Sequence, residues 1–385
     1  MEKFVFHVVS LPHTQTTPEY VSCAYTQKVI KFSRMMKDLG HTVYVYSSEE
    51  NEAPCDEHFS IISKKEQQEW FGEQDYKNKF YQLYWNHDHD SWLTMNSRAI
   101  SIIQEKRHSE KDFVALIGGN CQKQISDGLP GMLSVEFGIG YSGVFSNYKA
   151  FESYAWMHTV YGMQGTDNGT FFDTVIPNYY DPDEFEFSPD KEDYCLYIGR
   201  MISRKGVETA IQATERTGDK LLLAGQGVTH YEPGKLVTDE FTIEGDHFEF
   251  IGSLDVEQRS KVMSKAKAVF LTTNYLEPFG GTSIEPLFCG TPVITTDWGA
   301  FSENNIHGKT GYRIRTLGEA EWALKNLDKL DPYEIRNYAV NNFSLDRCKY
   351  LYQAWFEQLY TLWDKGWYSK WDAGVAEYGR YRKYM

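Results

Sequence analysis

The chain has 385 residues, of which 41% are hydrophobic and 24% charged, a balance typical of a globular protein long enough for two domains. It contains no apolar run near the roughly 20 residues that a membrane-spanning helix needs, and its formal charge of −15 would repel phosphate backbones and anionic lipid surfaces. Nucleic acid is therefore an unlikely partner, and no integral membrane segment is expected.

The six cysteines show no CxxC or other ligand spacing, and a chain of this length does not need disulfides, so reduced thiols are expected. The sequence begins MEKFVFHVVS, in which an acidic residue precedes a short apolar run that ends at Ser10. This pattern is typical of a first strand and not of a signal peptide. A cytoplasmic location is therefore expected.

The first half of the chain alternates strand-like apolar runs with helical patterns. A helix is expected at 19–39, and Gly40 directly after it would end the helix. A polar and aromatic stretch covers 50–95. Strands are expected at residues 4–10, 41–47, 113–118, 132–137 and 174–178. The alternation predicts a mostly parallel α/β sheet.

Pro177, Pro182 and Pro189 fall within thirteen residues and mark a domain boundary. The second half repeats the alternation, with strands expected at residues 194–199, 220–225, 248–252, 268–273 and 292–296 and helices at 205–217 and 255–266. An amphipathic helix follows Ser344. We therefore expect a first domain at 1–180, a second at 181–343, and a C-terminal helix and tail at 344–385 that packs back on the first.

The sequence EPFGGTSIE, residues 277–285, follows the predicted strand 268–273 and precedes a short predicted helix. Gly280 and Gly281 would let backbone amides approach a ligand, and the start of the helix would offer unpaired N–H groups to an anion. An ordinary turn is the alternative, in which Thr282 and Glu285 form a capping box for the helix.

The sequence GRMISRKG, residues 199–206, also follows a predicted strand and carries Arg200 and Lys205. Two fixed cations at the end of a strand can hold a diphosphate without a metal, Arg through forked hydrogen bonds and Lys as a point charge. Solvent-exposed surface charge is the alternative. In two parallel α/β domains the strand ends face a cleft, which is where such folds bind ligands.

Together these segments resemble the carboxy-terminal domain of the family-4 retaining glycosyltransferases, which have the GT-B fold and an E-x7-E motif. The segments that match in order are IPNYYDPDEF, YIGRMISRKG, LLLAGQG, FIGSL, EPFGGTSIEPLFCGTPVITTD and GAFSENNIHGKTG. The resemblance implies two Rossmann-like parallel-sheet domains that face an interdomain cleft.

The resemblance also implies roles for individual residues. Arg200 and Lys205 would hold the diphosphate of a nucleotide sugar, and Glu277 would complete the catalytic set by binding the sugar and the β-phosphate. Glu285 would accept hydrogen bonds from the ribose hydroxyls, because an ionised carboxylate is a pure acceptor. The other donor-binding residues, which would act through their backbone, are Phe279, Gly280, Gly281 and Thr282.

The sequence departs from the family pattern at several positions. Pro286 follows the second glutamate, where the family commonly has alanine, and LPHTQTTPEY replaces the usual glycine-rich loop after the first strand. Glu136 stands where a histidine is often found. By this alignment the candidates on the acceptor side are His13, Glu136, Glu152 and His158, each of which could instead have a structural role.

Asp88-His89-Asp90 matches the D-x-D pattern that binds manganese in other glycosyltransferases, and Asp181-Pro182-Asp183 matches it too. Two matches in one acidic chain indicate that this pattern arises easily by chance. We therefore expect both segments to be solvated loops, and no metal is predicted. The sequence GQGVTH, residues 225–230, has histidine in place of the last glycine of a dinucleotide-binding G-x-G-x-x-G, which argues against an oxidoreductase.

The resulting hypothesis is a glycosyltransferase that needs neither metal nor cofactor and moves a hexosyl group from a UDP- or GDP-sugar to an acceptor hydroxyl, such as that of a glycan, with retention. The alternatives are a sugar-nucleotide epimerase or a sugar phosphorylase on the same fold, or a glycosyltransferase that acts on a DNA base or a lipid. A non-catalytic sugar-binding protein also stays open.

Overall fold

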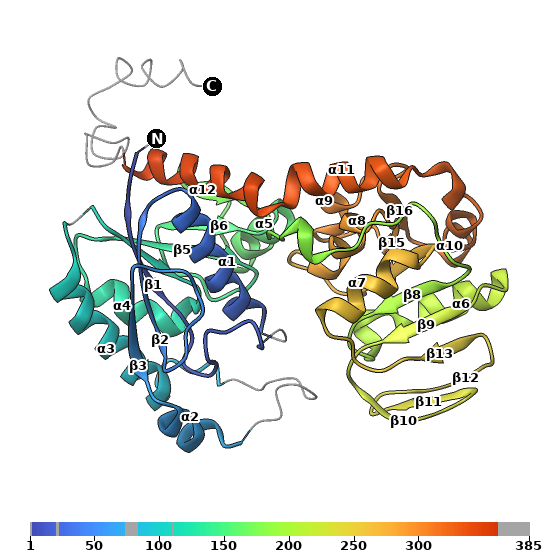
Figure 1. Cartoon of the computed structure of the whole chain (residues 1–385), viewed down its shortest axis with the longest axis horizontal. Coiled ribbons are helices and arrows are strands. Elements are labelled where there is room, and N and C mark those ends of the chain that lie inside the picture. Colours follow the sequence, from blue (N-terminus) through green and yellow to red (C-terminus); the bar gives the residue numbers. More distant parts are fainter. Residues whose placement is uncertain (1, 21–22, 74–83, 110, 361–385) are drawn as a thin grey trace, which may run out of the picture.

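The computed structural model describes residues 2–20, 23–73, 84–109 and 111–360. These residues form two α/β lobes that lie side by side, each built around its own parallel sheet (Figure 1). We call the lobe with the N-terminal sheet the first lobe and the other the second lobe. The alternation of strands and helices along the sequence predicted both sheets.

The first lobe contains a seven-stranded sheet in the order β3-β2-β1-β4-β5-β6-β7, and all its neighbouring strands are parallel. Its strands are β1 (Val5–Val9), β2 (Thr42–Ser48), β3 (Glu57–Ile62), β4 (Phe113–Leu116), β5 (Leu133–Ile139), β6 (Tyr148–Phe151) and β7 (Thr174–Val175). Every residue of β4 and β5 is buried, because helices or other chain segments cover both faces of a parallel sheet. The sequence analysis missed β3 and β6.

The helices of the first lobe pack around this sheet (Figure 1). They are α1 (Ala24–Asp38), α2 (Lys64–Phe71), α3 (Asp90–Lys106), α4 (Lys123–Gly128) and α5 (Tyr154–Met163). In α1 the buried residues Val29, Phe32 and Met36 recur at helical spacing and form one apolar face. The predicted start of α1 at Glu19 was wrong, because Tyr20 and Cys23 instead make turn hydrogen bonds to Thr17 and Tyr20.

The second lobe contains a six-stranded parallel sheet in the order β13-β9-β8-β14-β15-β16. Its strands are β8 (Cys195–Ile198), β9 (Leu221–Ala224), β13 (Phe248–Phe250), β14 (Ala268–Leu271), β15 (Val293–Thr296) and β16 (Gly311–Ile314). Its helices are α6 (Val207–Thr217), α7 (Val256–Lys265), α8 (Glu285–Phe288), α9 (Phe301–Asn304), α10 (Leu317–Leu324) and α11 (Pro332–Phe343). Strands β8, β14 and β15 are fully buried, which explains why their apolar runs were visible in the sequence.

A small antiparallel sheet is inserted between β9 and β13 and lies below β13, at the lower edge of the second lobe in Figure 1. It consists of β10 (Val228–Glu232), β11 (Lys235–Thr238) and β12 (Thr242–Glu244). Its strands are short and partly exposed, and Leu236 supplies a buried apolar contact to the lobe. The sequence analysis did not predict this sheet, because short half-exposed strands lack a continuous apolar run.

The chain crosses between the lobes twice, and the two crossings lie side by side. Tyr180 pairs with Ser344 in an isolated parallel bridge, donating its N–H to Phe343 O and accepting one from Leu345. After this bridge, α12 (Leu345–Tyr360) returns to the first lobe, where the Phe356 ring lies 4.7 Å from the Phe6 ring, centroid to centroid. Residues 361–385, the rest of the predicted C-terminal tail, lie outside the described residues.

Among the described residues, no helix combines the length and the apolar character that crossing a lipid bilayer demands.

Candidate functional site

A cavity of about 530 Å³ lies between the two lobes. Its first-lobe wall comes from α1, and its second-lobe wall comes from the segments that follow β8 and β14 and from α7. The carboxyl ends of parallel strands therefore face this space, as in other open α/β sheets. The charged residues that line it are Lys28, Lys31, Glu184, Arg200, Lys205, Arg259, Glu277 and Glu285.

The loop after β8 brings Arg200 and Lys205 to the cavity. The hydroxyl of Tyr197, on β8, donates to the backbone of this loop. It lies 3.1 Å from Arg200 O and 3.4 Å from Lys205 O. Gly206 then starts α6 with φ +71°, and a Cβ there would lie 1.9 Å from Thr272 O. Glycine at this position allows the loop to pack directly against the end of β14.

Lys205 and Glu277 form an ion pair at the edge of the cavity. Lys205 Nζ lies 3.0 Å from Glu277 Oε1 and 3.3 Å from Oε2, and both side chains are largely buried, with exposed fractions of 19% and 11%. The ring of Tyr275 lies 4.8 Å from the same Nζ and 4.1 Å from the Arg204 guanidinium. The ion pair and the ring together hold the Lys205 ammonium in one place.

The glycine pair of the loop 277–285 is required by close packing. Gly280 has φ +72°, and a Cβ there would lie 2.5 Å from the Phe301 ring. A Cβ on Gly281 would lie 2.4 Å from the Tyr180 hydroxyl. Gly281 and Thr282 line the cavity, whereas the Phe279 side chain is buried in the core of the second lobe.

Helix α8, which follows this loop, is only four residues long, and Pro286 occupies its second position. Its first flanking residue is Ile284, whose side chain makes no capping hydrogen bond. The capping box suggested for Thr282 and Glu285 is therefore absent, and that interpretation was wrong. So short a helix also supplies little macrodipole, and an anion here would depend mainly on side-chain cations.

Glu285 is paired with Arg259, a residue that the sequence analysis did not single out. Arg259 Nε lies 2.7 Å from Glu285 Oε2, and Nη2 donates to Oε1 at 3.2 Å. Helix α7, which carries Arg259, was predicted, but one arginine on a polar helix looks the same as a surface charge in the sequence. The structure places its guanidinium in the wall of the cavity.

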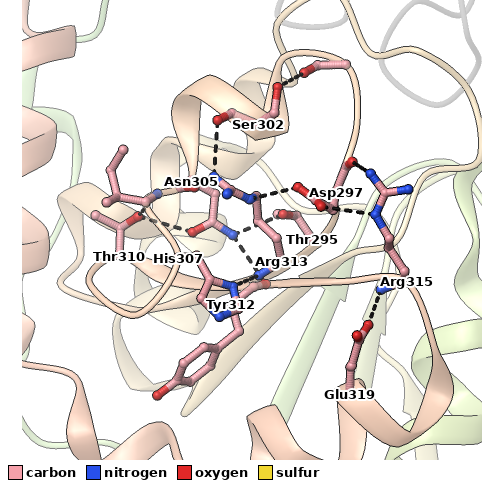
Figure 2. A network of polar contacts seen from close by, with 12 residues as sticks. Thr295, Asp297, Ser302, Asn305, His307, Thr310, Tyr312, Arg313, Arg315 and Glu319 are labelled. Carbon is pink, nitrogen blue, oxygen red and sulfur yellow. Dashed lines mark hydrogen bonds and ion pairs between the residues drawn. The ribbon is translucent and has the colours of Figure 1, made fainter.

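A polar network joins side chains between the end of β15 and the start of α10 (Figure 2). Asp297, directly after β15, pairs with Arg313 at 2.9 Å and with Arg315 at 3.1 Å. Arg313 also donates to the carbonyls of Ser302 and Asn305, at the two ends of α9.

The segment that this network holds in turn contacts the loop 277–285 through its backbone. The Ala300 N–H donates to Glu277 O at 3.0 Å, and the Asn304 side chain donates to Phe279 O at 2.8 Å. Residues 297–315 thus fix the backbone on which the Glu277 carboxylate stands.

The four acceptor-side candidates occupy different environments in the first lobe. Glu152 is buried, and its carboxylate contacts the Lys28 ammonium, which lines the cavity. Glu136 accepts hydrogen bonds from the N–H groups of Phe145 and Ser146, both at 2.8 Å, and from a tyrosine hydroxyl. Its burial raises its pKa to about 7.

The two histidine candidates lie away from the wall of the cavity. His13 is buried beside Cys23, whose Sγ lies 3.5 Å from His13 Nε2, and burial lowers the His13 pKa to about 3. His158 is exposed on α5, with its ring 6.3 Å from the Tyr154 ring. Neither histidine lines the cavity, and the sequence analysis missed Lys28, which does.

The two lobes contact each other beside the cavity. Ser153, which caps α5, donates its hydroxyl to Pro278 O at 2.6 Å. Glu303, on α9, accepts from the N–H groups of Tyr154 at 2.9 Å and Ala155 at 2.6 Å. A carboxylate at a helix N-terminus is favourable, so these contacts stabilise the observed arrangement of the lobes.

Within the described residues, no group of three or more His, Cys, Asp or Glu side chains is arranged to hold a metal ion. Asp88 and Asp90 are exposed, and the His89 side chain caps α3 by accepting from Ser91 N–H. Asp181 caps a short turn and pairs with Arg34 at 2.7 Å. His89 and Asp181 thus cap helical turns, and among the described residues neither D-x-D match belongs to such a group.

Comparison with known proteins finds a family match in the second lobe. Residues 182–337 match the family model described as glycosyl transferases group 1. Glycogen synthase from Mycobacterium tuberculosis is 31% identical over 147 residues, which cover 36% of this chain and 35% of the relative. An uncharacterized glycosyltransferase, MJ1607 of Methanocaldococcus jannaschii, is 28% identical over 173 residues, 41% of this chain and 40% of the relative. The match thus spans about a third of the length of the glycogen synthase.

Solved structures resemble more than nine-tenths of the chain. AviGT4, a glycosyltransferase involved in avilamycin A biosynthesis, superposes with a TM-score of 0.62 over 93% of this chain and 98% of its own, at 19% identity. Sucrose-phosphate synthase from Thermosynechococcus elongatus gives a TM-score of 0.59 over 94% and 99%, at 16% identity. The predicted GT-B fold is confirmed by these likenesses and by the two parallel sheets. Residues 182–337 thus match the glycosyl transferases group 1 model, and the chain that contains them has the GT-B fold.

Proposed function

We propose that this protein is a metal-independent glycosyltransferase of the retaining E-x7-E type, which moves a hexosyl group from a nucleoside-diphosphate sugar to an acceptor hydroxyl. The observation that carries the proposal is the charged cavity between the lobes, where Arg200, Lys205, Glu277 and Glu285 line one wall. The match of residues 182–337 to a glycosyl transferase domain supports the same reading.

In this proposal Arg200 and Lys205 bind the diphosphate of the donor. As the bond between the sugar and the diphosphate breaks, negative charge develops on the departing phosphate, and cations that are already in place stabilise that charge without reorganisation. Lys205 is suited to this role because Glu277 and Tyr275 fix its ammonium. The leaving group would then share the ammonium with Glu277.

Glu277 and Glu285 would bind the polar groups on either side of the diphosphate. Glu277, with the backbone of residues 279–282, would hold the transferred sugar and the β-phosphate. Glu285 would accept hydrogen bonds from the ribose hydroxyls. Arg259 lies against Glu285 and would keep this carboxylate oriented for that purpose.

A structural relative solved with a nucleotide indicates which donors to test first. Anabaena Alr3699/HepE, which is 13% identical to this chain and has a TM-score of 0.58, was solved in complex with UDP and glucose. UDP-sugars are therefore the first donors to test, and GDP-sugars the second. On the acceptor side, Glu152 contacts Lys28 of the cavity wall, and the roles of all four candidates, His13, Glu136, Glu152 and His158, stay predictions.

Calorimetric titration with UDP, GDP and ADP, followed by their sugars, tests the proposal. We expect tight binding of one diphosphate, release of that diphosphate from its sugar when an acceptor is added, and retention of the anomeric configuration in the product by NMR. Binding of none of them, or a crystal with the nucleotide outside this cavity, would contradict the proposal. An inverted product would refute the retaining mechanism alone.

A further inference from the structure

Two large aromatic side chains of the first lobe are exposed next to each other, just before α3. Tyr84 is 58% exposed and Trp85 is 51% exposed. Adjacent exposed rings of this size are uncommon on a protein surface that has no binding role. Trp85 begins the segment WNHDHDSW, residues 85–92, and Tyr84 directly precedes it. The proposed function does not use the D-x-D pattern of this segment.

These rings rest on a rigid base. The indole of Trp92 is fully buried, donates its N–H to Tyr84 O at 2.9 Å, and stacks on Trp85 with the ring centroids 5.7 Å apart. The Tyr84 ring stacks with His89 at 5.3 Å and with Phe71 at 6.4 Å. The exposed faces are thus held in place before any ligand arrives.

A chain of contacts connects the rings to the cavity. The Trp85 ring lies 5.8 Å from the Tyr25 ring, centroid to centroid, and the Tyr25 ring lies 5.0 Å from Lys28 Nζ. Lys28 and Ala24, on either side of Tyr25 along α1, both line the cavity. A ligand that extends over these rings would therefore lead into the place where the donor is proposed to bind.

The chemistry around the rings identifies the kind of ligand. A pyranose presents a face of weakly positive C–H groups that packs on the electron-rich face of an aromatic ring, while its hydroxyls need acceptors and donors at the rim. Asn86, His87 and Asp88 are exposed directly beside the rings and supply such groups. The carboxylate of Asp88 would repel a phosphate, which disfavours nucleic acids and phosphorylated ligands.

We propose that Tyr84 and Trp85, with the polar side chains of residues 86–88, form a stacking platform for an uncharged glycan. In combination with the proposed function, on which this part rests, the platform binds the sugars of the acceptor chain that lie farther from the reacting hydroxyl. The acceptor is then an oligosaccharide or polysaccharide and not a monosaccharide or a sugar phosphate, because only a chain reaches from the platform to the cavity.

The platform is tested by measuring the binding of three hexasaccharides with saturation-transfer NMR and calorimetry. The three are maltohexaose, cellohexaose and chitohexaose. We expect at least one of these hexasaccharides to bind the full-length protein. The variants Trp85→Ala and Tyr84→Ala should each weaken that binding about tenfold. Trp85→Phe should keep most of the affinity, since it keeps a ring. The matched control is Trp322→Ala, which removes a 50% exposed tryptophan from the second lobe and should change nothing.

Thermal unfolding and UDP or GDP titration of the same variants separate the possible failures. Absence of binding by all three hexasaccharides to the wild type, or unchanged binding in both alanine variants, overturns the platform. A change in oligomeric mass in Trp85→Ala with unchanged glycan binding overturns it too, in favour of a contact between copies. If glycans bind through Trp85 but no nucleoside diphosphate binds, the platform stands and the proposed function falls.

Discussion

The ion pair between Lys205 and Glu277 gives the sharpest test of the proposed chemistry. Replacing Lys205 by methionine keeps most of the aliphatic length of the side chain and removes its charge. Two effects follow at once, because the diphosphate loses a cation and Glu277 keeps a carboxylate that is only 11% exposed and has lost the ammonium 3.0 Å away. The first effect lowers the rate, and the second lowers both the rate and the stability.

The structure allows the size of each effect to be worked out. Removing one preorganised donor from a developing anion typically costs about 3 to 4 kcal/mol, which corresponds to about 10²- to 10³-fold in kcat. Leaving a partly buried carboxylate without its partner costs about 1 to 3 kcal/mol of folding free energy. The estimate for Lys205 lies at the low end, because its side chain is 19% exposed and water can reach the site.

Release of the nucleoside diphosphate from a donor sugar, measured by a coupled assay, reports the rate, and thermal unfolding reports stability. The control variant is Lys220→Met, which removes a lysine paired with Glu249 at 2.8 Å on the surface of the same lobe. We expect Lys205→Met to lose at least about 10²-fold in kcat with a small decrease in Tm, and Lys220→Met to change neither. A Lys205→Met protein with near-normal turnover would refute the reasoning.

Three further predictions concern packing, pH and metal dependence. Gly280→Ala should lower the free energy of unfolding, measured in denaturant, by about 2 to 4 kcal/mol, because Gly280 has a positive φ and a Cβ there would contact the Phe301 ring. The control is Gly218→Ala, which should cost about 1 kcal/mol, because Gly218 has φ +76° but open space around it. Because burial raises the Glu136 pKa to about 7, the folded protein binds this proton more tightly than the unfolded chain, and stability should fall by up to about 3 kcal/mol as pH rises from about 4.5 to about 7. Glu136→Gln should flatten that slope in unfolding measured across pH. Diphosphate release should continue in excess EDTA, and a loss that added Mn²⁺ restores would contradict metal independence.

Much of the second lobe could be predicted because its signals are local. The buried strands β8 and β14 are continuous apolar runs, and the glycines and charges that follow them stand at fixed offsets from those runs. Strand β16 (GYRI) contains Arg313 and was not predicted. Lys205 and Glu277 are 72 positions apart, yet each is placed at the end of a neighbouring strand, so their proximity follows from the topology of a parallel sheet.

The partners of the site could not be predicted in the same way. Arg259 and Lys28 reach the cavity from the sides of α7 and α1, and a charge on a helix has the same local pattern whether it faces water or a ligand. The inserted sheet β10–β12 was missed because its strands are short and half exposed. For the two cations the decisive information is a contact between distant segments, which composition and periodicity do not record. The inserted sheet instead pairs consecutive short strands, and their half-exposed residues give no continuous apolar run.

The contacts between the lobes and those within the second lobe have different consequences for the site. The Lys205–Glu277 and Arg259–Glu285 pairs each lie entirely within the second lobe, whereas the bonds of Ser153 and Glu303 join the lobes. A movement that separates the lobes would therefore break the hydrogen bonds of Ser153 and Glu303. It would leave the two ion pairs of the second lobe intact. The ion pair that positions the Lys205 ammonium therefore does not depend on the contacts between the lobes.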